Sequence, residues 1–222
     1  MIDFQQELLS NCEFAAPSRT HEGDVRVGSY TLPSGIRAIW KVADGLITKR
    51  GVFRVFASIS RPGIPSVEQW NNSEWKRNYG GLAADLVFVA EDIFGDQYGY
   101  KFIGADKEFV KFYCEDGQVQ SIQGGFNQFI EALIEPARTN LVDLEMVSLA
   151  EQTGLHPSAR EHLAFRVPLC MGGEYSVANL AVESIELHLG MASQLVAQSS
   201  EVPDGTPVRG ASEIPGHPSG SA

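Results

Sequence analysis

Long apolar runs are missing from this chain. No stretch approaches the roughly 18 consecutive apolar residues that a membrane-spanning helix requires, and the opening MIDFQQE has neither the basic start nor the apolar segment of a secretory signal. We therefore expect a cytoplasmic protein with no membrane partner. The length of 222 residues and the hydrophobic content of 43% are ordinary for a globular chain of one or two domains.

Cysteine is scarce, and the histidines are scattered. The three cysteines, Cys12, Cys114 and Cys170, lie far apart without CxxC spacing, so the sequence predicts neither a disulfide framework nor a zinc site. The five histidines form no HxxxH or HExxH pattern. His188 falls in the last predicted helix, where a surface or boundary position is expected. We predict no metal and no other cofactor.

Motifs for catalysis and for phosphate binding are also missing. The chain has no GxSxG, no GxGxxG and no GxxxxGK[ST], so its three glycine pairs are best explained as turns. It has no basic patch with interleaved aromatic residues, which disfavours nucleic acid as a partner. Active sites can be assembled from residues far apart in sequence, yet the missing motifs favour a non-catalytic binding protein over an enzyme.

Negative charge is concentrated in the later part of the chain. The net charge is −11; residues 1–81 hold ten Lys/Arg against eight Asp/Glu, and residues 82–222 hold seven against twenty. Such a field repels nucleic acid and anionic membranes and speeds encounter with a basic partner. Solubility alone is the alternative explanation for an acidic surface.

The stretch from Gly80 to Gly104 predicts a hairpin. Residues 86–90 form a short apolar run typical of a buried strand, Phe94-Gly95 is suited to a tight corner, and residues 98–102 alternate as a second strand. Four carboxylates precede the first base, Lys101. These carboxylates are Asp85, Glu91, Asp92 and Asp96. The sequence therefore predicts a hairpin with an acidic tip.

The remaining periodicities place helices on both sides of the predicted strands. Helices are expected at residues 3–9 (capped by Asp3), 32–45, 67–79 (capped by Ser66), 126–134, 141–152 (capped by Asn140) and 182–196, and further strands at 52–56, 109–114 and 118–122. Residues 13–30 are polar and irregular. Trp70 and Trp75 are interpreted as core residues, with an aromatic anchor for a partner as the alternative. The pattern indicates an α+β fold, mainly an antiparallel sheet with helices packed against it.

The hairpin also carries a resemblance to a known family. Residues Phe88 to Tyr98, FVAEDIFGDQY, resemble the core hairpin of the SUKH superfamily, whose members include fungal cell-wall assembly regulators and many bacterial immunity proteins. Leu32 to Gly45 resembles the family helix that ends in an Asp-Gly turn, and Gly125 to Ile130 resembles its closing helix. More weakly, Phe165 to Leu180 resembles the C-terminal extension of some bacterial members.

The resemblance and the composition together give four segments. Residues 1–29 are expected to form an N-terminal helix and connector, residues 30–136 a SUKH-like α+β core, and residues 137–198 a helical extension packed on that core. Residues 199–222 are rich in proline, glycine and serine and are expected to form a disordered tail.

The resemblance implies a bacterial immunity protein that neutralises a cognate toxin, often a nuclease, by direct binding. An acidic surface would steer towards a basic toxin or another basic protein, and neighbouring tyrosines would supply desolvated contact. The residues predicted to bind the partner are Asp85, Glu91, Asp92, Asp96, Tyr98 and Tyr100. Two alternatives stay open: a regulatory scaffold or peptide-binding adaptor unrelated to toxins, and a metal-dependent enzyme that uses the same carboxylates.

Overall fold

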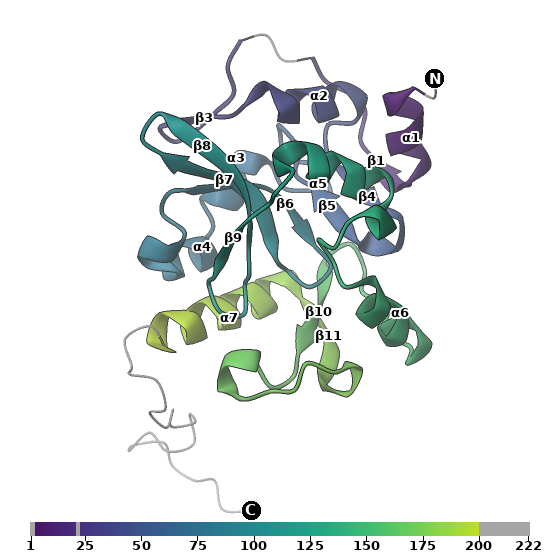
Figure 1. The fold of residues 1–222 in the computed structure, drawn as a ribbon, viewed down its shortest axis with the longest axis vertical. Coiled ribbons are helices and arrows are strands. Elements are labelled where there is room, and N and C mark those ends of the chain that lie inside the picture. The colour runs from purple at the N-terminus through teal and green to yellow at the C-terminus, as the bar shows by residue number, and fades with distance from the viewer. Residues whose placement is uncertain (1–2, 21–22, 200–222) are drawn as a thin grey trace, which may run out of the picture.

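The computed structural model describes residues 3–20 and 23–199, and its centre is one antiparallel sheet. Seven strands lie in the order β1-β4-β5-β6-β7-β8-β9, and every neighbouring pair is antiparallel (Figure 1). They are β1 (Cys12–Ala15), β4 (Leu46–Thr48), β5 (Phe53–Val55), β6 (Leu86–Asp92), β7 (Gln97–Ile103), β8 (Asp106–Phe112) and β9 (Val119–Ser121). The predicted α+β class with a mainly antiparallel sheet is confirmed.

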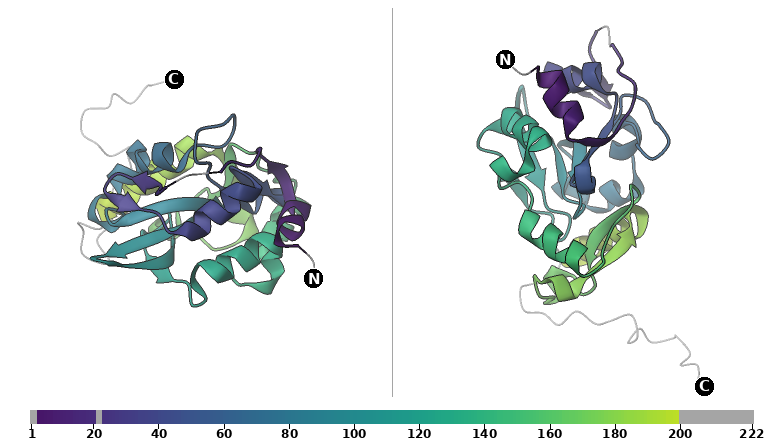
Figure 2. Two further views of the ribbon diagram at one scale, coloured as in Figure 1. Left: turned by 90° about the horizontal axis from the view of Figure 1, so that it is seen from above. Right: turned by 90° about the vertical axis from the view of Figure 1, so that its right-hand side faces the viewer.

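Helices cover both faces of this sheet (Figure 2). One face packs against α5 (Gly125–Ile134), and the other against α3 (Val67–Asn71), α4 (Glu74–Asn78) and α7 (Ile185–Ser199). The other helices are α1 (Phe4–Ser10), α2 (Ser34–Val42) and α6 (Leu144–Gln152), and the short 3-10 turns are η1 (Lys49–Gly51), η2 (Gly80–Leu82), η3 (Pro136–Arg138), η4 (Leu169–Met171) and η5 (Val177–Asn179). None of the described helices is long and apolar enough to cross a membrane.

Aromatic side chains form the contact between sheet and helices on each face. The Phe129 ring of α5 stacks on Tyr98 with centroids 5.2 Å apart. On the other face Trp75 stacks on Phe88 at 6.0 Å, and its ring meets that of Trp70 edge to face at 5.4 Å. Both tryptophans are only 8% exposed, which confirms their interpretation as core residues. Burial of such large rings supplies much of the hydrophobic stabilisation of a fold.

Side-chain caps fix where several helices begin. Asp3 accepts a hydrogen bond from the Gln5 N–H at the start of α1, and Ser66 accepts one at the start of α3, as predicted. The prediction of Asn140 as a cap is wrong. The Asp143 carboxylate caps α6 instead, accepting from the Met146 N–H at 2.9 Å.

The segments before and after the core contain strands that the sequence pattern did not indicate. At the start of the segment expected to be irregular, β1 pairs with β4, and at its end β2 (Arg26–Val27) pairs with β3 (Tyr30–Thr31). The extension is not wholly helical either, because β10 (Glu161–Phe165) pairs with β11 (Leu180–Ser184) before α7 begins. These strands are short, so they show too few alternations to be recognised. Of the predicted disordered tail, Ser199 ends α7, and residues 200–222 lie outside the described residues.

Gly99 provides a test of the close approach between β6 and β7. A Cβ atom there would lie 2.2 Å from the Val87 carbonyl oxygen and 2.7 Å from Phe88 Cα, beside the register shift in this strand pair. We predict that Gly99→Ala lowers the free energy of unfolding by about 2–4 kcal/mol, because backbone atoms must move to admit the methyl group. Urea denaturation followed by circular dichroism measures this change.

The matched control is Gly81→Ala. A Cβ at Gly81 would meet no atom within 4 Å, and this glycine does not have a positive φ angle. Its substitution should change the free energy of unfolding by less than about 0.5 kcal/mol. Equal effects of the two substitutions would contradict the close approach at Gly99.

Candidate functional site

The corner between β6 and β7 is closed by one of the predicted acidic residues. Asp92 Oδ1 accepts hydrogen bonds from the backbone N–H groups of Phe94, at 3.0 Å, and Asp96, at 3.2 Å. Gly95 has a φ angle of 84°, and a Cβ there would lie 2.9 Å from His162 Nδ1. Two constraints therefore favour glycine at position 95: the positive φ angle of its backbone, and the histidine ring that leaves no room for a Cβ atom.

A single lysine forms ion pairs with two carboxylates at the corner. Lys111 Nζ lies 3.1 Å from Asp92 Oδ2 and 2.9 Å from Asp96 Oδ2, and its side chain is 9% exposed. Burial raises the pKa of Asp92 to about 6, against the opposing effect of Lys111. Burial disfavours the charge of Lys111 in turn, but the two carboxylates outweigh it and raise the pKa of Lys111. This group therefore holds the turn together from within the fold.

Glu91 forms a second buried ion pair. Arg54 on β5 faces Glu91 on β6 across the strands, with Nη1 2.6 Å from Oε1 and side-chain exposures of 8% and 1%. Burial alone would raise the pKa of Glu91, but the Arg54 charge, the neighbouring His162 and hydrogen bonds to the carboxylate outweigh it, so the pKa is lowered. Glu91 therefore stays ionised although it is buried.

Two histidines continue this chain of contacts. His162 Nε2 on β10 lies 3.4 Å from Glu91 Oε2, and His162 Nδ1 lies 3.1 Å from His188 Nδ1 on α7. Burial lowers the pKa of His162, which favours the neutral ring. His188 Nε2 then lies 3.2 Å from Glu115 Oε1. The expectation of a surface or boundary position for His188 is wrong, because this side chain faces inward and the residue is 7% exposed.

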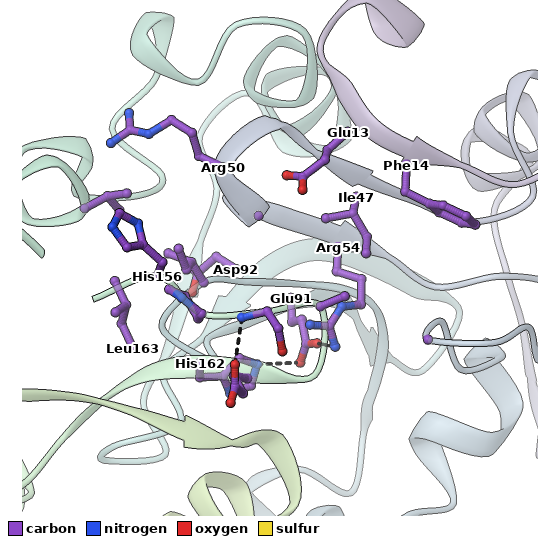
Figure 3. Close-up of a pocket in the computed structure, with 18 of the residues that line it drawn as sticks. Glu13, Phe14, Ile47, Arg50, Arg54, Glu91, Asp92, His156, His162 and Leu163 are labelled. Carbon is purple, nitrogen blue, oxygen red and sulfur yellow. Dashed lines mark hydrogen bonds and ion pairs between the residues drawn. The ribbon is translucent and has the colours of Figure 1, made fainter. Parts of the chain in front are cut away.

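A cleft of about 360 Å³ opens above Arg54, Glu91 and His162 (Figure 3). Its walls come from β1, from η1 and from residues 155–163, segments that are far apart in the sequence. Figure 3 shows the three charged or ionisable groups next to one another, joined by their contacts. Other residues that line the cleft include Glu13, Phe14, Ile47, Arg50, Glu151, His156, Ser158 and Glu161. The cleft is therefore a candidate binding site in the described part of the chain.

The prediction of an exposed acidic tip is wrong. Glu91, Asp92, Tyr98 and Tyr100 are each at most 4% exposed, so none of them presents a surface to a partner in the folded chain. The Glu91 carboxylate contacts Arg54 and His162, and the Asp92 carboxylate contacts Lys111; these partners are distant in the sequence, so local patterns did not indicate the contacts. Glu91 and Asp92 therefore stabilise the fold from within.

The other predicted residues are separated from this group or only partly exposed. Asp85 is exposed before the start of β6, where its carboxylate accepts a hydrogen bond from the Tyr30 hydroxyl at 3.2 Å. Asp96 is half-buried beside Lys111. Tyr98 and Tyr100 share one face of β7 as the alternation predicted, but that face packs against α5. The structure thus does not bring the six predicted residues together on a surface.

Sequence reasoning missed Arg54, Lys111 and His162. A signal was present for Arg54 and Lys111, since each interrupts a short apolar run, VFRVF and FVKFY; His162 follows Glu161 at the start of EHLAF and carries no such signal. A charged residue in the middle of a strand that is buried on both faces requires a buried counter-charge. This rule identifies which residues need partners, although it does not say which carboxylate each one finds.

No family model matches the chain, and no curated protein matches it.

Glu91→Gln tests the buried ion pair with little change in side-chain size. We expect the free energy of unfolding at pH 7 to fall by about 3–5 kcal/mol, because Arg54 keeps its charge without a counter-ion. The pKa of Glu91 is lowered in the folded protein, so its contribution is complete above the ordinary value of 4.5 and is lost as the pH falls through the lower folded value. The difference between wild type and variant should therefore shrink below pH 4.5, measured by urea unfolding across a pH series.

Glu135→Gln is the control for this measurement. Glu135 pairs with Arg138 on the surface, with side chains 50% and 68% exposed. Loss of such a pair should change the free energy of unfolding by less than about 1 kcal/mol at pH 7. A Glu91→Gln variant as stable as this control would show that the Arg54 pair contributes little.

Proposed function

We propose that this chain is a non-catalytic protein-binding domain of the SUKH type, an immunity protein that neutralises a cognate basic toxin in the cytoplasm. The arrangement of elements is compatible with the resemblance. The stretch from Phe88 to Tyr98 folds as strand, tight turn and strand, the stretch from Leu32 to Gly45 contains α2, and Gly125 begins α5.

The acidic lining of the cleft carries this proposal. Five carboxylates and two arginines line it. Three of the carboxylates are paired, Glu91 with Arg54, Glu151 with Arg50 and Asp92 with Lys111. Glu13 and Glu161 have no ion-pair partner among the residues that the structure describes. They leave an excess of negative charge, which favours a lysine or arginine side chain of a partner.

Apolar groups beside these carboxylates provide the second requirement of a protein interface. Phe14 on the edge strand β1 is 43% exposed, and Ile47 on β4 lies next to it in the cleft wall. Binding energy in protein complexes is concentrated where apolar side chains are desolvated beside oriented polar groups. The cleft combines both features, and it takes the place of the predicted tyrosines as the partner-binding site.

The same geometry argues against acid–base catalysis in the cleft. A general base has to reach the proton that it removes, either directly or through one water molecule. Glu91 and His162 are each 1% exposed and contact each other, and Glu91 is also paired with Arg54. These groups form a fixed floor under the cleft, which supports a binding role.

The test is protection from a toxin. If a neighbouring gene encodes a large secreted protein, its variable C-terminal domain is expressed in a bacterial host with and without this chain. We expect the chain to restore growth and to form a complex that weakens as salt rises, because the contacts are charged. A toxic domain that the chain neither binds nor neutralises would contradict the immunity role and favour a regulatory scaffold.

Cleft variants make the test specific. Glu13→Lys combined with Phe14→Ala changes two exposed residues of β1 and should weaken the complex by roughly 10-fold or more, since it reverses a charge and removes an aromatic contact. Glu108→Lys, a change at an exposed position of β8 that does not line the cleft, is the matched control and should leave the affinity unchanged. Thermal unfolding checks that both variants fold. Equal affinities would place the interface elsewhere.

A further inference from the structure

Three potential metal ligands converge where β8 ends and α7 passes. They are Cys114, Glu115 and His188. His188 Nε2 lies 3.2 Å from Glu115 Oε1 and 4.0 Å from Cys114 Sγ, and all three ligand atoms lie within 4.8 Å of one another. Ligand atoms around a tetrahedral zinc ion lie roughly 3.2–3.8 Å apart, given bonds of about 2.0–2.3 Å. Small side-chain movements would therefore bring these atoms to zinc-binding distances.

A chain of contacts through the two histidines provides a second observation. Glu91, His162, His188 and Glu115 make three successive contacts, each of which involves a ring nitrogen. His162 contacts one nitrogen of the His188 ring, and the other nitrogen of that ring lies beside Glu115 and Cys114. His162 therefore helps to orient His188 towards the other two residues.

We propose that Cys114, Glu115 and His188 bind a zinc ion, with His162 as the outer residue that orients His188. A thiolate, an imidazole and a carboxylate are a ligand set typical of zinc, whereas Mg²⁺ and Ca²⁺ prefer oxygen ligands alone. The zinc would lie among His188 Nε2, the Glu115 carboxylate and Cys114 Sγ, which already lie within 4.8 Å of one another. Binding displaces the thiol proton of Cys114 to solvent, so that the affinity rises with pH.

The surroundings of the three residues resemble those of an organised site. Glu115 Oε2 accepts a hydrogen bond from the Leu169 N–H at 3.3 Å, and the Cys114 N–H donates to Asp96 Oδ1 at 3.1 Å. Outer contacts of this kind hold ligands in place before the metal arrives. The Glu115 side chain is 13% exposed, which gives the site an edge towards solvent. None of the three ligands lines the cleft, so this proposal does not depend on the proposed function.

Metal binding by the full chain tests the proposal. Protein freed of metal with a chelator is titrated with ZnCl₂ by competition with a chromogenic chelator, and separately with CoCl₂ by absorption spectroscopy. We expect one zinc per chain with a dissociation constant of about 1 μM or lower. The Co²⁺ form should show a thiolate-to-metal charge-transfer band, which reports ligation by cysteine directly. No saturable binding below about 100 μM free zinc would overturn the proposal.

Variants with matched controls locate the site. Cys114→Ser and His188→Gln should each weaken zinc binding by roughly 100-fold or more, and His162→Gln by about 10-fold. Cys12→Ser and His156→Gln change the same residue types away from the site and should leave the affinity unchanged. Circular dichroism checks folding, and if the ligand variants unfold, the Co²⁺ spectrum of the wild type decides. Unchanged binding in folded ligand variants, or a Co²⁺ spectrum without the thiolate band, would overturn the proposal.

Discussion

The desolvation of Glu91 is the constraint on which the rest of this structure depends. A carboxylate that is 1% exposed is stable only when its charge is matched at close range. Arg54 supplies the opposite charge from the neighbouring strand, and His162 and Gln97 supply further contacts. Because these groups come from β5, β7 and β10, the charge of one residue fixes the relative position of three strands.

The same requirement explains why the C-terminal part of the chain packs so closely on the sheet. β10 contacts the corner of the hairpin through its backbone, since the Leu163 N–H donates to the Ile93 carbonyl at 2.8 Å. α7 contributes Leu189 and Val196 to the same hydrophobic cluster that contains Phe88 and Phe129. The extension therefore completes the core that the earlier residues begin, and the acidic corner is buried as a consequence.

Local patterns in the sequence were sufficient for the hairpin, for α5 and for the fold class. The β6–β7 hairpin depends on neighbouring residues, namely an apolar run, a glycine corner and an alternating strand, and each of these is visible within 20 or so positions. The burial of its acidic residues depends instead on Lys111 and His162, which pair with them only through the tertiary fold. Charged side chains in a short stretch of sequence are usually predicted to be exposed to solvent. That prediction fails where a residue distant in the sequence supplies a buried counter-charge. The cleft was not predictable for a similar reason, since β1 and residues 155–163 meet only in three dimensions.

The residues that pack on Gly95 come from the C-terminal part of the chain, and this order matters during biosynthesis. Arg54, Glu91 and Lys111 all leave the ribosome well before His162 and His188, which pack on the corner. Docking of β10 and α7 brings His162 and His188 onto this corner, and the apolar contacts and backbone hydrogen bonds of these two elements help to offset the cost of burying Glu91.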